Sequence, residues 1–396
     1  MHTDVCVIGN GAIGKTVALG LAQAGHRVSL LCQAPSSAKV ESASAQWDLR
    51  VYALNTIARN LLTSLKVWDA LDASRVAPVT GMVVNGDGAR GGKLEFDAYG
   101  AHAEALAWIV EDRNLNQALD AALRFASNVT LVSGRAVRLG ADGQQALVEL
   151  EGGDSLTASL VVGADGAHSW VRNQCDIGID YRPYDQRAVV SNFSCELPHQ
   201  GQAFQWFTAS EGIVALLPLP GNRISLVWSA PELLATTLMQ ETAGQLAARL
   251  SALPGQPFGQ LQPLLPEAKQ AIPLALIRAH QLVGPRVALV GDAAHAVHPL
   301  AGHGMNLGFS DVVALLDTLA DEAARRDCGD ARVLARYARA RAEDVLLMQL
   351  ATDGLERLFN AQFEPLRIVR NLGLNLLNQF PQIKRRLMAH ASGSRH

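Results

Sequence analysis

The chain of 396 residues is 49% hydrophobic and only 18% charged, so it is long enough for two or three domains around a sizeable core. A net charge of -3 and a pI near 6.4 argue against a nucleic-acid binder, whose surface is normally basic. The five cysteines are scattered and form no CxxC pair, which favours a reducing, cytoplasmic location over a disulfide scaffold. No apolar run approaches the roughly 18 residues that a membrane-spanning helix needs.

The first 31 residues are predicted to form a βαβ unit. Residues 5–8 are a continuous apolar run, typical of a strand that is covered on both faces. Apolar residues at helical spacing follow until Gly25, and residues 28–31 resume the sheet. The crossover between the two strands is expected to be right-handed.

A GxGxxG motif, Gly9, Gly11 and Gly14, lies between the first strand and the helix of this unit. Such glycines permit a tight turn and let a pyrophosphate approach the helix N-terminus, which predicts dinucleotide binding. The acid expected about 20 residues later is missing, because Cys32 and Gln33 stand there. Gln33 remains an alternative partner for ribose hydroxyls.

The middle of the chain mixes helix and strand patterns. Helices are expected at 56–65, 115–125 and 243–250. Strands are expected at 49–54, 81–96 and 160–163, in a small meander over 129–132, 136–139 and 146–150, and at 188–193, 203–208, 212–217 and 223–228. Beyond residue 330 the chain is expected to be helical.

Two further strands end in glycine and aspartate. Residues 160–163 lead into a loop with Asp165, and residues 287–290 lead into Gly291 and Asp292. A glycine-punctuated loop and a helix follow Asp292, so an acid for hydroxyls lies near the positive end of a helix. This combination favours a polyol beside a group that becomes negative, as in a reduced flavin. The alternative is an ordinary strand–turn–helix connection, but three such ends are expected to converge on one long cofactor.

These three segments resemble the fingerprints of the class A FAD-dependent aromatic monooxygenases, which have the para-hydroxybenzoate hydroxylase fold. The resemblance is closer still to the ubiquinone-biosynthesis hydroxylases of the UbiH/UbiF type. It rests on the segment GDAAHAVHPLAGHGMNLGFSD at 291–311, DLRVYALN at 48–55 and PLRIVRNLGL at 365–374, and it spans essentially the whole chain.

The resemblance implies an α/β fold, with a Rossmann-like FAD-binding domain, a β-rich substrate domain and C-terminal helices. The implied FAD-binding domain comprises residues 1–75, 101–180 and 273–330. The implied substrate domain comprises residues 76–100 and 181–272, and the C-terminal helical region comprises residues 331–396.

The resemblance also implies roles for residues that bind the cofactor. The pyrophosphate would be held by Gly9, Gly11 and Gly14. Arg50 would contact the phosphate or ribose region, and Asp292 would bond the ribityl hydroxyls. Asp165 would lie at the cofactor, and this position is linked in such enzymes to the handling of nicotinamide.

The loop beside the isoalloxazine ring is implied to be the catalytic loop. It comprises Pro299, Gly302 and Gly304, with Met305 and Asn306 as further cofactor contacts. His303 departs from the family, because glutamine is usual at this position.

His295 and His298 are spaced as metal ligands could be, but the sequence shows no third ligand near them. Hydrogen-bonded histidines beside the loop are therefore expected, and no metal site is predicted. Gln205, Trp206 and residues 216–219 are expected to form a wall over the flavin.

The activity implied by the resemblance is hydroxylation of the aromatic ring of a polyprenyl phenol in ubiquinone biosynthesis, through a flavin C4a-hydroperoxide formed with O2. NAD(P)H is the expected reductant and would bind transiently, because only one dinucleotide fingerprint is present. The alternatives are a flavin-dependent dehydrogenase or reductase of the same fold, and a non-catalytic member of a quinone-biosynthesis enzyme complex.

The tail over residues 365–388 is both apolar and basic, with cations that include Arg367 and Arg370. Such a segment suits either anionic lipid headgroups, in a peripheral contact on the inner face of a membrane, or the groove of a partner protein. The alternative is a terminal helix that packs on the core with solvated arginines.

Overall fold

The computed structural model describes residues 1–32, 46–86, 92–208, 211–265, 268–298 and 303–360. Within this part of the chain the strands form three sheets. The first sheet contains β1 (His2–Ile8), β2 (Val28–Cys32), β8 (Val129–Ser133), β9 (Ala136–Ala141), β10 (Ala146–Leu150), β11 (Ser155–Gly163), β18 (Val283–Gly284) and β19 (Val287–Leu289).

The second sheet is larger and mostly antiparallel. It contains β5 (Gly81–Asn85), β6 (Lys93–Asp97), β12 (Ile179–Cys195), β13 (Gln202–Thr208), β14 (Gly212–Leu219), β15 (Arg223–Pro231), β16 (Leu261–Pro263), β17 (Gln270–Ala279) and β20 (His295–Ala296). The third, small sheet contains β3 (Val51–Leu54), β4 (Val76–Val79) and β7 (Ala107–Glu111).

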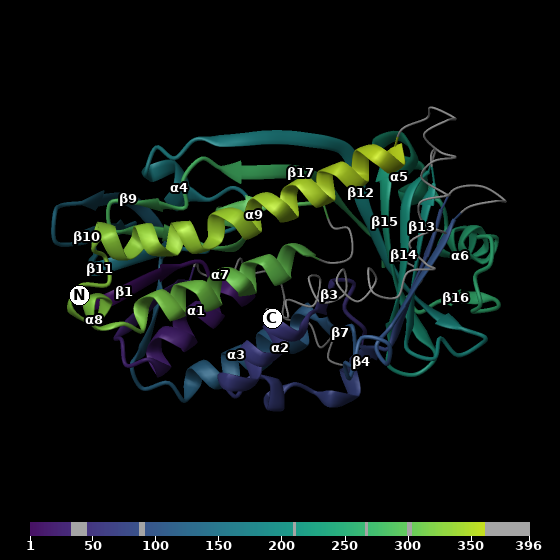
Figure 1. The fold of residues 1–396 in the computed structure, drawn as a ribbon, viewed down its shortest axis with the longest axis horizontal. Helices are drawn as coiled ribbons and strands as arrows, with labels where there is room; N and C mark the ends of the chain where they lie inside the picture. The colour runs from purple at the N-terminus through teal and green to yellow at the C-terminus, as the bar shows by residue number, and fades with distance from the viewer. Residues whose placement is uncertain (33–45, 87–91, 209–210, 266–267, 299–302, 361–396) are drawn as a thin grey trace.

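Helices cover these sheets (Figure 1). They are α1 (Ala12–Gln23), α2 (Thr56–Ser64), α3 (Asp112–Arg124), α4 (Trp170–Gln174), α5 (Glu232–Gln240), α6 (Ala243–Ser251), α7 (His303–Leu319), α8 (Glu322–Arg326) and α9 (Ala331–Asn360), with the short 3-10 helices η1 (Trp68–Ala70), η2 (Ala73–Arg75) and η3 (Gly291–Ala293). Helix α9 runs along the molecule from α8 towards the second sheet and packs on α7.

The first sheet has a parallel centre in the order β19-β11-β1-β2-β8. Its strands are continuous apolar runs because both faces are covered. Val5 and Val7 face a core shared with α1, α3 and α7, whereas Cys6 and Ile8 face a second core under β9, β10 and α4. This alternation explains why the first strand shows no polar side.

One sequence prediction about this sheet is wrong. Strand β8 does not belong to a meander with β9 and β10, because it pairs in parallel with β2. The meander instead consists of β9, β10 and β11. The short turn after β8 resembles a hairpin in sequence, but α3 and β8 continue the βαβ winding of the parallel sheet.

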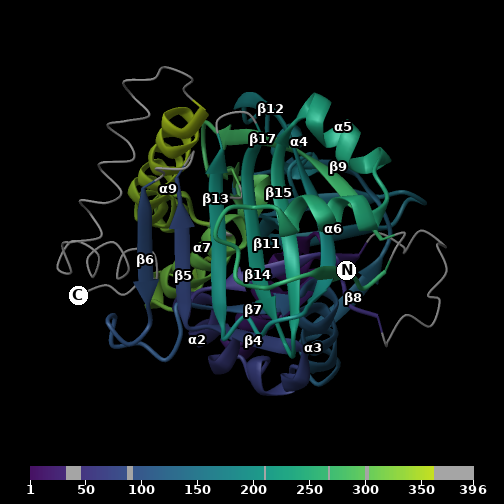
Figure 2. The same ribbon diagram turned by 90° about the vertical axis from the view of Figure 1, so that its right-hand side faces the viewer.

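The second sheet buries one face against α5 and α6, which lie in front of it in Figure 2. Trp206, Leu216 and Trp228 lie in this core. The opposite face turns towards the small third sheet, where Ala203 and Leu219 pack with residues of β4 and β7. A parallel sheet with helices, a β-rich part and C-terminal helices agree with the architecture predicted from the sequence.

Candidate functional site

The N-terminus of α1 is shaped for close approach of a ligand. Gly9 has a φ of +117°, and a Cβ there would lie 2.3 Å from the Ala164 carbonyl oxygen. A Cβ at Gly14 would lie 1.9 Å from the Gly9 carbonyl oxygen. Both glycines are therefore required by backbone packing. Around Gly11, in contrast, the described residues leave open space, and no side chain caps the helix. Its first N–H groups are thus available to an anion.

The three glycine-rich strand ends meet, as predicted. They follow β1, β11 and β19, which are neighbours in the parallel sheet, so they share one edge. The Ala164 amide donates to the Ile8 carbonyl oxygen (2.8 Å), and a Cβ at Gly291 would lie 3.4 Å from the Ile13 side chain. A long cofactor can therefore touch all three loops.

Asp165 makes internal hydrogen bonds at this edge. One carboxylate oxygen accepts from the Ser169 hydroxyl, and the other accepts from the backbone N–H groups of Trp170 (2.7 Å) and Val171 (3.0 Å). The carboxylate thereby caps α4. Buried Arg172 on α4 donates to the Ala293 carbonyl oxygen (2.9 Å), so the same element braces η3. A role of Asp165 in nicotinamide handling stays a prediction.

Arg50 and Asp292 are 242 positions apart in the sequence, yet they lie close enough for the charge of Arg50 to lower the pKa of Asp292. Asp292 retains solvent access, yet the protein atoms crowded around it desolvate the carboxyl and raise its pKa, while the charges of His295 and Arg50 oppose that rise. Tyr52 lies in the same electrostatic neighbourhood and donates to Asp112 Oδ1 (2.8 Å). A solvent-reachable carboxylate beside a guanidinium suits a ligand that carries both hydroxyls and phosphate.

A buried ionic cluster supports the backbone below Asp292. The carboxylate of Asp311, which is fully buried, lies 2.7 Å from His295 Nε2 and 2.7 Å from Arg341 Nε, and it accepts the Gly291 N–H (2.8 Å). Burial opposes ionisation, but the charges of His295 and Arg341 hold the pKa of Asp311 below its usual value. The cluster ties α7 and α9 to the loop that presents Asp292. Sequence reasoning missed Asp311 and Arg341.

The amide of Asn306 is used by the protein itself. Its Oδ1 accepts from the Asn55 N–H (2.9 Å), and its Nδ2 donates to the Ala53 carbonyl oxygen (2.7 Å), so it fixes the start of α7 to β3 and α2. Met305 is half-buried against the main core. Gly304 is open, because no described atom lies within 4 Å of a Cβ placed there. Pro299 and Gly302 lie outside the described residues.

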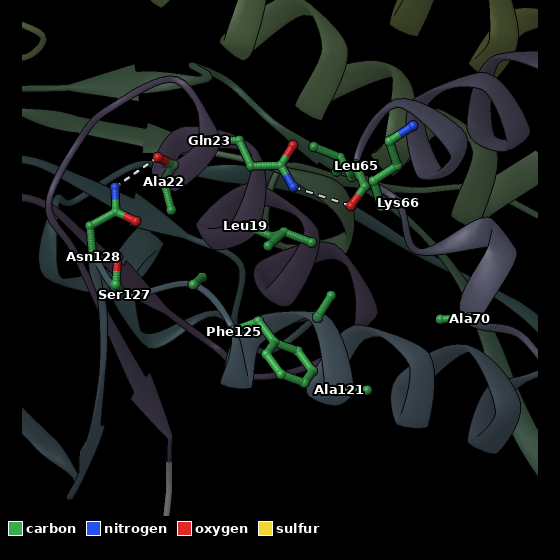
Figure 3. A pocket seen from close by; sticks show the side chains of 12 residues that line it. Leu19, Ala22, Gln23, Leu65, Lys66, Ala70, Ala121, Phe125, Ser127 and Asn128 are labelled. Atoms are coloured by element: carbon green, nitrogen blue, oxygen red, sulfur yellow. Dashed lines mark hydrogen bonds between the residues drawn. The ribbon is translucent and has the colours of Figure 1, made fainter.

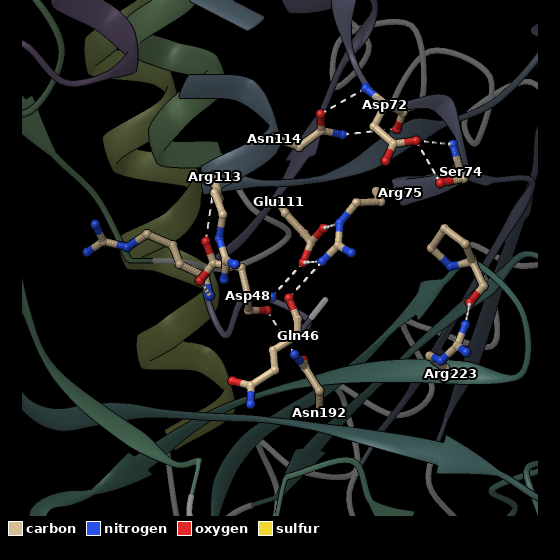
Figure 4. A network of polar contacts seen from close by, with 12 residues as sticks. Gln46, Asp48, Asp72, Ser74, Arg75, Glu111, Arg113, Asn114, Asn192 and Arg223 are labelled. Atoms are coloured by element: carbon tan, nitrogen blue, oxygen red, sulfur yellow. Dashed lines mark hydrogen bonds and ion pairs between the residues drawn. The ribbon is translucent and has the colours of Figure 1, made fainter. Parts of the chain in front are cut away.

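A second polar network holds the segment that leads to Arg50 (Figure 4). Asp48 accepts the Arg50 N–H (3.1 Å) and, through its other oxygen, the Arg113 N–H (3.1 Å). The Asp48 N–H donates to Glu111, which is 1% exposed and is held by Arg75 through two hydrogen bonds. Asp48 lies in a segment that the sequence analysis singled out, but nothing in the local pattern identified Glu111 or Arg75 as its supports.

The network also reaches the second sheet. Asn192 on β12 donates to the Asp48 carbonyl oxygen (2.8 Å), and the Asn192 side chain is buried. The strand that carries Asn192 therefore has a direct hydrogen bond to the segment of Arg50. The site lies where the first and second sheets approach each other.

His298 is a hydrogen-bonded histidine, as expected. Its Nε2 lies 3.2 Å from Gln186 Oε1, and its ring contacts Tyr184 edge-on at 4.9 Å. Burial lowers the pKa of His298 to about 4, so the ring is neutral at physiological pH. No cluster of three metal-ligating side chains occurs among the residues that the structure describes.

The expected wall over the flavin is divided between two faces of the second sheet. Trp206 and Leu216 point to the core with α5 and α6, and the Trp206 indole donates to the Pro254 carbonyl oxygen (3.0 Å). Gln205 and Leu217, their neighbours along the strands, point the other way because successive side chains alternate. Only this second set turns towards the segment of Arg50.

A surface hollow of about 480 Å³ lies elsewhere, between the C-terminal ends of α1 and α3 (Figure 3). Leu19, Gln23 and the exposed Phe125 line it. Because it lies at the opposite end of α1 from Gly11, it is separate from the three glycine-rich loops.

The residues at the shared edge fit FAD. The open N-terminus of α1 can take the pyrophosphate, Arg50 adds a cation, and Asp292 can accept hydroxyl groups. Gly304, at the start of α7, leaves room beside a positive helix end.

Comparison with known proteins agrees with this geometry. The FAD binding domain family matches residues 2–348. The chain is 36% identical to 3-demethoxyubiquinol 3-hydroxylase of Escherichia coli, over 99% of this chain and 98% of that protein. It is also 36% identical to the ubiquinone hydroxylase UbiL of Rhodospirillum rubrum, over 99% of this chain and 90% of that protein.

Solved structures show the same fold. PqsL of Pseudomonas aeruginosa in complex with 2-aminobenzoylacetate has a TM-score of 0.76 at 24% identity, over 94% of this chain and 99% of that chain. HpxO of Klebsiella pneumoniae complexed with FAD has a TM-score of 0.73 at 20% identity, over 99% of both chains. The chain therefore belongs to the FAD binding domain family and is a class A FAD-dependent monooxygenase, similar over nearly its whole length to the ubiquinone hydroxylases.

Proposed function

We propose that this monooxygenase hydroxylates the aromatic ring of a polyprenyl phenol in ubiquinone biosynthesis. The names of its relatives in Escherichia coli and Rhodospirillum rubrum support this substrate class. The observation in the structure that carries the proposal is the chemical character of the second sheet on the face that turns towards the segment of Arg50.

Three adjacent rows of side chains on that face are neutral. The rows pair Ala188 with Ser229 and Ile213, Val190 with Val227 and Ala215, and Asn192 with Ser225 and Leu217. Val227, Ala215 and Leu217 are only half-buried, although β14 and β15 are central strands. Room for a ligand therefore remains over an apolar surface with a few hydroxyl and amide groups. Such a surface accepts a neutral phenol, and these three rows offer no cation to a carboxylate.

The individual assignments predicted from the sequence are kept as proposals. Gly9, Gly11 and Gly14 hold the pyrophosphate, Arg50 contacts the phosphate or ribose, and Asp292 bonds the ribityl hydroxyls. Bound FAD supplies the redox and oxygen-transfer chemistry, with O2 as the oxygen source and NAD(P)H as a reductant that binds transiently. A substrate ring that lies on the half-buried apolar face would displace water from it.

An isotope experiment tests the proposal. The reaction is run under heavy dioxygen with a short-chain polyprenyl phenol and, in parallel, with the same phenol bearing a ring carboxylate. We expect one heavy oxygen atom in the product of the neutral phenol and at least tenfold lower turnover of the carboxylate. Oxidised product without heavy oxygen would indicate a dehydrogenase, and absence of turnover with both phenols would favour a non-catalytic member of a quinone-biosynthesis complex.

We also propose that the protein works at the inner face of a membrane, because its substrate is oily. No helix in the described ranges is long and apolar enough to span a bilayer. The tail over 365–388, whose composition motivates this proposal, lies outside the described residues. Flotation with anionic liposomes at low salt, comparing the full chain with one that ends at residue 363, tests it. Equal flotation of the two chains would refute a role of the tail.

A further inference from the structure

The end of β2 lacks the acid that dinucleotide-binding motifs place there. Cys32 is the last residue of β2, next to the strand that carries Gly9. In such motifs a carboxylate at this position accepts hydrogen bonds from the adenosine ribose. Burial raises the pKa of the Cys32 thiol, and a thiol is a poor acceptor. An acceptor for these hydroxyls must therefore come from another residue.

A carboxylate on α3 reaches towards this strand end. Lys15, one turn into α1, lies with its Nζ 2.7 Å from Asp120 Oδ1 and donates to Asn116 Oδ1 (3.1 Å). Asn116 and Asp120 lie one turn apart on α3, which packs along α1. The Lys15 side chain is 10% exposed, whereas the Asp120 side chain is 49% exposed. The lysine is thus fixed inside the protein, and the acid keeps access to solvent.

The pair lies close to the end of β2. The charges of Lys15 and Asp120 both act on the pKa of the Cys32 thiol, and Asn10, inside the GxGxxG motif, also influences it. Cys32 packs against the core that contains α1 and α3, so its side chain points to the layer of the pair. A carboxylate has about four acceptor sites, so the contact with Lys15 leaves Asp120 capacity for a ligand.

We propose that Asp120, which pairs with Lys15, replaces the missing acid at the end of β2 and accepts hydrogen bonds from the adenosine ribose hydroxyls of FAD. The inference rests on FAD binding at the three glycine-rich loops and is independent of the ring substrate. If the Lys15–Asp120 pair were purely structural, it would only hold α1 against α3 and would make no contact with the ribose. The two roles differ in whether the protein senses the ribose hydroxyls.

The test measures the dissociation constants of FAD and of an FAD analogue that lacks the ribose 2′-hydroxyl of the adenosine, by quenching of flavin fluorescence. We expect the wild-type protein to bind FAD about tenfold more tightly than the analogue, as for a hydrogen bond to a charged group. Asp120→Asn and Asp120→Ala are expected to reduce this preference to about twofold or less. Asp180→Asn, which changes an exposed acid in another pair, serves as the control and keeps the preference.

Lys15→Met separates the two roles, because it removes the pair and keeps the Asp120 carboxylate. We expect this variant to bind both flavins more weakly and to retain the preference for FAD. An unchanged preference in both Asp120 variants would overturn the proposal. Gln33, which lies outside the described residues, would then be the candidate acceptor for the ribose hydroxyls. Equal loss of preference in Lys15→Met and Asp120→Asn would also overturn it. If the wild-type protein bound neither flavin, the FAD site itself would be wrong.

Discussion

Glu111 is expected to be a major support of the cofactor site, although it is not expected to contact FAD. In the Glu111→Gln variant, Arg75 loses its charged partner, and the amide cannot accept every hydrogen bond that the carboxylate accepts. Removing one partner of a buried ion pair typically costs about 3–5 kcal/mol. Arg75 keeps 19% exposure and a bond to the Gln46 carbonyl oxygen, so we expect the lower end, about 3 kcal/mol.

The loss should also reach Arg50, because the Asp48 N–H donates to Glu111 and Asp48 holds the backbone of Arg50. If Arg50 loses part of a charge-assisted contact worth roughly 1 kcal/mol, FAD affinity falls about fivefold. The stability measurement is urea unfolding of FAD-free protein, because bound ligand would raise the apparent stability.

Glu149→Gln is the matched control, since it makes the same chemical change in an exposed pair. Arg138 and Glu149 lie 3.3 Å apart with side-chain exposures of 72% and 38%. Such an exposed pair is typically worth about 0.2–1 kcal/mol. If Glu111→Gln costs no more free energy of unfolding than Glu149→Gln, the supporting role inferred for Glu111 is incorrect.

Three further predictions concern the edge that carries Asp292. Asp292→Asn is expected to weaken FAD binding about 10- to 100-fold in a fluorescence titration, through loss of a charge-assisted hydrogen bond; unchanged affinity would mean that Asp292 does not bond the ribityl chain. Asp311→Asn leaves Arg341 charged and buried, so it should destabilise FAD-free protein by about 3 kcal/mol, and a loss below about 1 kcal/mol would contradict the cluster. In the folded protein the pKa of His298 is about 4, so the ring stays neutral down to that pH. In the unfolded chain the same ring binds a proton as the pH falls below about 6.5. The contribution of His298 to stability is therefore fully present above pH 6.5 and is lost as the pH falls. Between pH 7.5 and pH 5, His298 is expected to lower the free energy of unfolding by about 2 kcal/mol. Urea unfolding should therefore show that His298→Asn loses about 2 kcal/mol less stability than the wild type over this pH range. An identical pH dependence in both proteins would exclude His298 as the source of the loss.

The glycine-rich loops could be predicted from sequence because their signal is local. Each combines a buried strand with glycines and, in two cases, an acid, and the carboxyl ends of parallel strands must share an edge. Local spacing gave the wrong prediction for β8, because its short connection to β9 resembles a hairpin although β8 pairs with β2. Local spacing does not reveal that β2 offers a parallel partner to β8, because the pairing joins residues about a hundred positions apart.

The supports of the site could not be predicted for a related physical reason. Arg75 and Glu111 come from different strands and turns, and Asp311 meets Arg341 only after α9 folds back on α7. A buried charge carries no periodic signature, since its position is stable only once its partner is in place. The glycine-rich loops therefore leave a local pattern in the sequence, whereas the buried ion pairs that support them do not. Gly9 and Gly14 satisfy a steric demand of the backbone packing, whereas the role proposed for Asp120 depends on its pair with Lys15 and on the thiol at Cys32. The comparison of FAD with its 2′-deoxy analogue in the Asp120 variants tests whether this set of residues recognises the ribose.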